Sequence, residues 1–235
     1  DLIYDFNTGE LITNLNENIY LIMNGWFMHN PDLKTGHNNI KFPIKNNKII
    51  PIYISTCLSK DVIKLYTEEC IEHYKKYSPI MCRDSSTFNL LQEKGVDVYL
   101  YGCLTQLLDI NNIPDNNNYK EKYKDSIIYI DCPKKWEKRD NNEKNYYFKH
   151  YIDELLTMTP KERINYARDL LSKYKYAKKI YSYRLHAFLP CRAMGLDVMY
   201  VGDINYRVCD LVNNIPDKLK LKENFLEYIA KITAF

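Results

Sequence analysis

Short apolar segments alternate with amphipathic segments along this chain, and the alternation restricts the folds that it can adopt. Residues 80–82 and 96–100 have the length of buried strands, and residues 83–94 between them have the character of a helix. Gly95 stands where a helix commonly ends, because glycine adopts a left-handed conformation without strain. Strand–helix–strand units of this kind build parallel sheets with right-handed crossovers. The pattern predicts an α/β protein.

The same alternation of apolar and amphipathic segments begins earlier in the chain. Residues 1–18 are expected to form a cap or a short hairpin, and residues 19–23 a buried parallel strand. A second strand is predicted over 48–55, where Pro51 favours an edge or a bulge. An amphipathic helix is predicted over 60–77, ending at Ser78-Pro79.

A polar stretch near the middle, Asn111 to Asp125, marks the best boundary between two halves. We therefore predict an N-terminal α/β half over 1–112, a linker over 113–125 and a C-terminal α/β half over 126–235. In the second half, strands are expected at 126–131, 178–182 and 198–202. A charged loop is expected over 134–145. Helices are expected over 146–176, interrupted at Met158-Thr159-Pro160 with Thr159 as the cap before Pro160, then from Leu185, and over 221–234.

Composition excludes several classes of protein. With 33 basic and 30 acidic residues the net charge is +3, which is too balanced for a dedicated nucleic-acid binder. The seven cysteines form no CxxC pair or zinc-type cluster, so we expect reduced thiols, a cytoplasmic location and no metal.

No apolar run approaches the roughly 20 residues that span a membrane. No glycine-rich phosphate loop of the GxGxxG or GxxxxGK type occurs, which argues against nicotinamide-dependent and P-loop enzymes.

Candidate site residues follow the predicted strands, because ligands of open α/β sheets lie beyond the carboxyl ends of the strands. Arg83 and Arg184 occupy equivalent positions in the two halves, after the strands at 80–82 and 178–182. The full set of segments is Asn24-Gly25-Trp26, Ser55-Thr56, Arg83-Asp84, Tyr101 to Thr105, Arg184-Leu185-His186 and Gly202-Asp203.

The segment Arg184-Leu185-His186 combines a permanent cation with a proton donor at a strand-to-helix turn. Arginine offers a planar fork for phosphate or carboxylate, and histidine exchanges a proton near neutral pH. Backbone N–H groups at the start of the helix also attract anions. By themselves the two residues favour a plainer interpretation, an arginine that caps the helix and a histidine packed in the core.

Plainer interpretations also exist for the other candidates. Arg83 can pair with Asp84, and Arg207 can pair with Asp203 in a loop. The remaining histidines are expected to be exposed to solvent. They are His29, His37, His73 and His150.

Several of these segments, taken in order, resemble the polysaccharide pyruvyl transferase family. The resemblance covers most of residues 19–212. It rests on Leu21 to Phe27, Cys82-Arg83-Asp84-Ser85-Ser86-Thr87, Gly102-Cys103-Leu104-Thr105, Tyr183 to Cys191, and Tyr206-Arg207.

This resemblance implies a GT-B-like fold, with two Rossmann-like parallel-sheet halves around a cleft. It implies transfer of the carboxyethylidene group of phosphoenolpyruvate to two hydroxyls of a sugar, giving a pyruvate ketal without a cofactor. Arg83 and Arg184 would bind the phosphate and carboxylate of the donor, and His186 would be the proton donor. Further substrate-binding positions carried over from the matching segments are Asn24, Gly25, Trp26, Asp84, Gly102, Leu185 and Arg207.

Family members begin with a longer first domain, so the resemblance implies a shortened first half, the half expected to hold the acceptor. Two other functions stay open on the sequence: a GT-B-like glycosyltransferase that uses a nucleotide sugar, and a non-catalytic module that binds glycan or phosphate. The expected partners are phosphoenolpyruvate and a glycan or sugar acceptor, with no nucleic acid. The sequence does not name the acceptor sugar.

Overall fold

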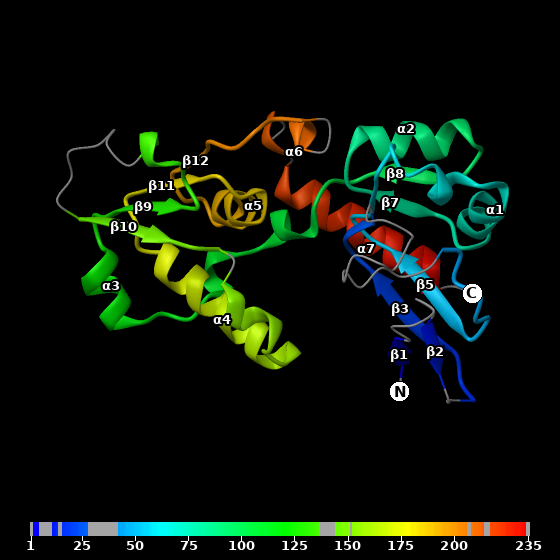
Figure 1. Cartoon of the computed structure of the whole chain (residues 1–235), viewed down its shortest axis with the longest axis horizontal. Helices are drawn as coiled ribbons and strands as arrows, with labels where there is room; N and C mark the ends of the chain where they lie inside the picture. Colours follow the sequence, from blue (N-terminus) through cyan, green and yellow to red (C-terminus); the bar gives the residue numbers. More distant parts are fainter. Residues whose placement is uncertain are drawn as a thin grey trace. The chain divides into compact units, whose positions relative to one another are not determined.

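The computed structural model describes residues 2–4, 11–13, 16–27, 42–136, 144–150, 152–205, 208–213 and 217–233. The chain forms two compact units (Figure 1). The first contains residues 1–103 together with 219–235, and the second contains residues 104–218.

The first unit is built on three pairs of parallel strands. Strand β3 (Ile19–Met23) pairs with β5 (Ile49–Tyr53), β4 (Trp26–Phe27) with β6 (Cys57–Leu58), and β7 (Ile80–Cys82) with β8 (Val98–Leu100), all parallel. A bridge between Thr56 and Cys82 joins the β5–β6 segment to β7. An antiparallel hairpin of β1 (Leu2–Tyr4) and β2 (Leu11–Thr13) precedes them, as the sequence predicted.

Helices α1 (Glu68–Lys76) and α2 (Ser85–Glu93) cover one face of this sheet. Alternate side chains of β7 divide between its faces, because successive residues of a strand point in opposite directions. Ile80 and Cys82 pack into the core with Tyr74 and Leu91, whereas Met81 lies toward the C-terminal helix. The predicted helix over 60–77 is shorter than expected, because Thr67 caps α1 and a 3-10 turn (Ile63–Tyr66) precedes it.

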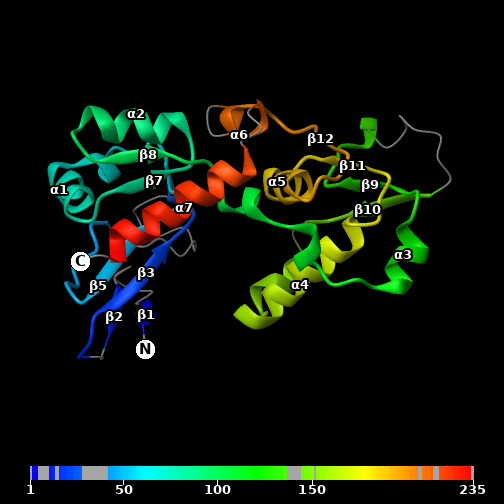
Figure 2. The same cartoon turned by 180° about the vertical axis from the view of Figure 1, so that it is seen from behind.

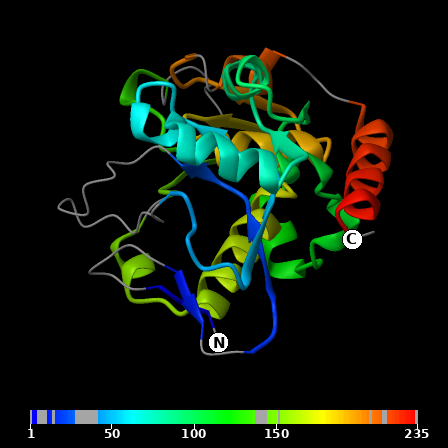
Figure 3. The same ribbon diagram turned by 90° about the vertical axis from the view of Figure 1, so that its right-hand side faces the viewer.

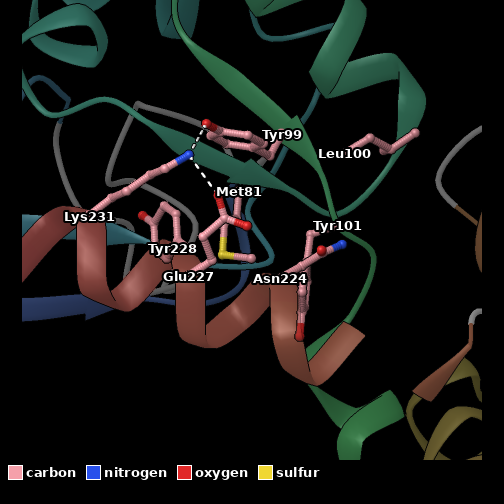
Figure 4. A pocket seen from close by; sticks show the side chains of 8 residues that line it. All are labelled: Met81, Tyr99, Leu100, Tyr101, Asn224, Glu227, Tyr228 and Lys231. Carbon is pink, nitrogen blue, oxygen red and sulfur yellow. Dashed lines mark hydrogen bonds and ion pairs between the residues drawn. The ribbon is translucent and has the colours of Figure 1, made fainter. Parts of the chain in front are cut away.

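Helix α7 (Lys218–Thr233) packs on the opposite side, against β7 and β8 (Figures 3 and 4). The hydroxyl of Tyr228 donates to the carbonyl oxygens of Tyr53 and Pro79, at 3.0 and 3.1 Å. Lys231 reaches both the hydroxyl of Tyr99 and the carboxylate of Glu227. The C-terminal helix was predicted in the second half, but these contacts place it in the first unit.

The second unit contains a four-stranded parallel sheet. Its strands are β9 (Ile127–Ile130), β10 (Asn145–Phe148), β11 (Lys179–Ser182) and β12 (Val198–Tyr200), and their spatial order is β10-β9-β11-β12. Strand β10 therefore lies on one side of β9, whereas the later strands β11 and β12 lie on the other side. This reversal places a topological switch point between β9 and β11.

Three helices pack on one face of that sheet, α3 (Asn117–Tyr123), α4 (Pro160–Tyr174) and α5 (Leu185–Ala193) (Figure 2). Ile128, Ile130 and Ile180 point into this core. Helix α4 begins as predicted: Thr159 caps it, Pro160 is its first residue, and the Glu162 carboxylate bonds back to the cap. A short helix α6 (Cys209–Asn213) follows β12.

The predicted linker is part of the second unit. Ile113 and Tyr123 are each 4% exposed and pack into the core with Ile128. Lys175 donates to the carbonyl oxygen of Ile113, and Ser172 to that of Pro114. The sequence predicts a linker because the few apolar residues of this stretch show no period, yet these residues contribute to the core.

Burial of Tyr228 predicts that α7 stabilises the first unit. Replacing Tyr228 by alanine removes a side chain that is 3% exposed and leaves two carbonyl groups without their donor. We expect a loss of about 3–5 kcal/mol in the free energy of unfolding of the first unit. Hydrogen exchange measures this as faster exchange in β5 and β7 with unchanged exchange in β9 and β11.

Leu226→Ala on the same helix is the matched control, because Leu226 is 56% exposed. It should leave exchange in both units near that of the unmodified protein. Equal effects of the two substitutions would contradict the anchoring role of Tyr228.

Candidate active site

The candidate site of the second unit lies at the carboxyl ends of β9 and β11, the strands that flank the switch point. Asp131 follows β9 directly, and Arg184 follows β11 after one intervening residue. The Tyr183 N–H donates to the carbonyl oxygen of Ile130, which keeps the two strand ends together beyond their last paired residues. The fold therefore brings two residues that are 53 positions apart to one edge of the sheet.

Asp131 and Arg184 form an ion pair at this edge. The Nε of Arg184 lies 2.6 Å from Oδ2 of Asp131. The Asp131 side chain is 14% exposed, whereas that of Arg184 is 51% exposed. The other carboxylate oxygen of Asp131 accepts a hydrogen bond from the backbone N–H of His150 at 3.3 Å. One carboxylate thus connects the ends of β9, β10 and β11.

Arg184 stands at the N-cap position of α5, but its side chain does not cap the helix. The hydroxyl of Ser182 instead accepts a hydrogen bond from the Arg184 N–H. His186, in the first turn of α5, is exposed. The plainer interpretations of these two residues, a capping arginine and a core histidine, are therefore wrong.

His186 lines a cavity of about 300 Å³ on the helical side of the sheet. Most of its walls are apolar side chains of α4 and α5, including Leu170, Leu171 and Pro190. His150 and Arg163 also line it. This arrangement places two imidazoles at one apolar cavity near the switch point.

His150 was expected to be exposed to solvent, and the structure corrects this. Its ring Nδ1 is buried and has no hydrogen-bond partner among the described residues. Burial lowers the pKa of His150 below its usual 6.5, the Asp131 carboxylate opposes that shift, and the Arg184 guanidinium adds to it. Burial and the Arg184 guanidinium therefore favour the uncharged form of the ring.

In the first unit, hydrogen bonds bring several predicted residues to one edge of the sheet. Cys57 N–H donates to the carbonyl oxygen of Gly25, Arg83 N–H to that of Thr56, and Gly102 N–H to that of Cys82. Gly102 has a φ of +96°, a conformation that suits glycine at this turn. Asn24 lies next to Gly25, between β3 and β4.

Arg83 is 5% exposed, and its Nε is buried without a hydrogen-bond partner in the described part of the chain. The Cys57 thiol lies nearby. Burial raises the pKa of Cys57 to about 12, whereas the positive charge of Arg83 acts to lower it. A buried guanidinium with an unused donor is costly unless a ligand completes it. This favours an anion-binding role for Arg83.

Asp84 has a structural role that the sequence did not indicate. It is fully buried, and its carboxylate accepts hydrogen bonds from the backbone N–H of Thr87 at 2.9 Å and from the Thr87 hydroxyl. Asp84 therefore caps α2, and the geometry gives no support to its predicted contact with a substrate. The alternative pairing of Arg83 with Asp84 does not occur among the ion pairs of the described residues.

The remaining predicted site residues and histidines lie partly within and partly outside the described structure. Leu185 is half-buried in the first turn of α5, next to His186. The backbone of Trp26 belongs to β4, but its side chain lies outside the described part of the structure, as does the whole of Arg207. His29 and His37 also lie outside it. His73 was expected to be exposed but is buried, and it bonds to the hydroxyl of Tyr53.

Sequence reasoning missed Asp131 and His150 as site residues. Both follow strands, β9 and β10, so the rule that selected Arg83 and Arg184 applies to them as well. The helix predicted from residue 146 is wrong at its start, because residues 145–148 form β10, so the position of His150 after a strand was not expected. Within the described residues, no group of three or more His, Cys, Asp or Glu side chains is placed to hold a metal ion, and none of the seven cysteines forms a disulfide.

An exposed imidazole and an oriented guanidinium at the carboxyl edge of a parallel sheet are typical of enzymes that act on small anionic substrates. The chain belongs to the polysaccharide pyruvyl transferase family, whose model matches residues 3–200. It is therefore a transferase. Neither the curated proteins nor the solved structures gave a significant match. No helix in the described part of the chain is long and apolar enough to cross a bilayer.

The surroundings of His150 predict opposite effects of two substitutions. Asp131→Asn should lower the pKa of His150 further, because it removes the charge that favours the imidazolium. Arg184→Gln should raise that pKa, because it removes a charge that disfavours it. A titration of the ring proton signals by NMR measures both shifts, with His150→Gln assigning the signal. Shifts in the same direction would contradict this description of the site.

Proposed function

We propose that this chain transfers the carboxyethylidene group of phosphoenolpyruvate to two hydroxyls of a sugar within a glycan, forming a pyruvate ketal. Membership of the pyruvyl transferase family supports the reaction class. The single observation that carries the assignment to residues is the Asp131–Arg184 ion pair at the switch point, beside His186.

Arg184 is the proposed anion clamp. Asp131 engages its Nε, which leaves the two terminal nitrogens of the fork for the phosphate or carboxylate of the donor. Its side chain is half exposed, so a ligand can reach it. The N-terminus of α5 adds a positive dipole at the same place. A clamp of this kind also stabilises negative charge as phosphate departs.

Arg83 is a proposed anion-binding residue of the first unit, as the family resemblance implies. Its buried, unpartnered Nε supports this role, because an anion would supply the missing acceptor. The α2 N-terminus begins two residues later and favours the same charge.

His186 is the proposed general acid. It gives a proton to the methylene carbon of phosphoenolpyruvate, which becomes a methyl group, and positive charge develops on the neighbouring carbon. A sugar hydroxyl attacks that carbon, phosphate leaves, and the second hydroxyl closes the ketal. A positioned acid of this kind contributes about a hundred- to ten-thousand-fold in rate.

The test follows phosphate release and ketal formation from phosphoenolpyruvate with a panel of methyl galactosides. His186→Ala should abolish turnover and largely preserve donor binding, whereas Arg184→Ala should weaken donor binding by about tenfold or more, because it removes a charged hydrogen bond. Arg168→Ala, which removes an exposed arginine from α4, is the matched control and should leave both properties unchanged.

Two results would contradict the proposal. A fully active His186→Ala enzyme would remove the acid assignment. Absence of turnover with phosphoenolpyruvate, together with binding of a nucleotide sugar, would favour a GT-B-like glycosyltransferase.

A further inference from the structure

His150 is a second imidazole at the cavity that His186 lines. The two reach it from different elements, since His150 follows β10 and His186 lies in the first turn of α5. The His150 backbone is fixed by its hydrogen bond to Asp131, the residue that also holds Arg184. The position of this ring is therefore tied to the anion clamp, although its Nδ1 forms no hydrogen bond with any described residue.

Burial and two charged neighbours shift the pKa of His150. Its Nδ1 is buried without a partner among the described residues, and burial lowers its pKa below 6.5. Asp131 acts against this shift and Arg184 reinforces it. The other ionisable groups that line the cavity are Arg163, Tyr166 and Tyr174 of α4 and His186 of α5. An uncharged imidazole keeps a lone pair that can accept a proton.

The proposed reaction needs such an acceptor. Two sugar hydroxyls lose their protons when the two new C–O bonds form. One proton is needed to convert the methylene of the donor to a methyl group, and the other is needed by the departing phosphate. His186 supplies the first of these protons, so a second group must take the proton from the attacking hydroxyl.

We propose that His150 is the general base that accepts the proton of the attacking sugar hydroxyl. This rests on the function proposed above. As the hydroxyl oxygen bonds to the central carbon of the donor, its O–H bond breaks and the proton moves to the imidazole of His150. The C–O bond to phosphate then breaks, and the departing phosphate takes that proton. His150 returns to its uncharged form. When the second hydroxyl closes the ketal, its proton goes to His186 and replaces the one given to the methylene, so no other reactant is required.

The apolar walls of the cavity suit this role. Water attacking in place of the sugar would convert the donor to pyruvate and phosphate. Leucine, tyrosine and proline side chains around the two imidazoles disfavour water at this place. The acceptor group inferred for the cavity is therefore a hydroxyl carried on a sugar ring, whose C–H faces pack against such side chains.

The test compares His150→Gln with the unmodified enzyme, using phosphoenolpyruvate and the methyl galactoside that gives the highest turnover. Glutamine keeps a polar side chain of similar length but cannot accept a proton. We expect kcat to fall by about a hundredfold or more, with the Kd for phosphoenolpyruvate, measured by equilibrium dialysis, within twofold. His150→Asn provides a second variant should His150→Gln fail to fold.

The pH profile separates a base from a merely structural histidine. In the unmodified enzyme, kcat/KM for the acceptor should fall as the pH drops below 6.5, because His150 becomes protonated. The variant should lose this fall of kcat/KM at low pH, the acid limb of the profile. The matched control is His73→Gln: His73 is also buried, with its pKa lowered to about 4 by burial, but it belongs to the first unit. This variant should retain the kcat and the acid limb of the unmodified enzyme.

The outcomes are distinguishable. The unmodified enzyme can be active while the His150→Gln variant keeps its kcat, keeps the acid limb, or loses phosphoenolpyruvate binding in parallel with kcat. Each of these results would overturn the role of His150 and leave the proposed reaction standing. An unmodified enzyme that forms no ketal from phosphoenolpyruvate would overturn both.

Discussion

The ion pair between Asp131 and Arg184 is the interaction on which the candidate site depends. It joins the ends of β9 and β11, where the direction of sheet growth reverses, and its carboxylate also holds the backbone of His150. A long, flexible guanidinium is thereby given one orientation while half of its surface stays open to solvent. The pair is valuable for orientation more than for stability, because a half-exposed ion pair contributes little to the free energy of folding.

The two units use arginine differently, although each places it after a parallel strand. Arg184 is half exposed and already paired, whereas Arg83 is almost fully buried with an unused donor. Binding an anion at Arg184 therefore adds a second partner to an oriented cation, and binding one at Arg83 relieves an unsatisfied buried group. The same residue type thus favours anion binding in each unit for a different physical reason.

The sequence predicted those parts of the fold that local patterns encode. The strands at 178–182 and 198–202, the capped start of α4 and the α5 helix from Leu185 all lie where expected. Long-range packing was not predictable. Ile113 and Tyr123 are buried by residues far along the chain, and Tyr228 anchors α7 through carbonyl groups 149 and 175 positions away. Asp131 and His150 each follow a strand, but their closeness to the end of β11 depends on the strand order, which no local pattern carries.

A crystal structure of the complex with phosphoenolpyruvate tests the central claim most directly. The account predicts a phosphate or carboxylate oxygen within hydrogen-bond distance of the terminal nitrogens of Arg184, with Nε still on Asp131. It also predicts the donor's methylene carbon next to the imidazole of His186. A donor bound away from the ends of β9 and β11, or an Arg184 released from Asp131 and turned from the ligand, would contradict it.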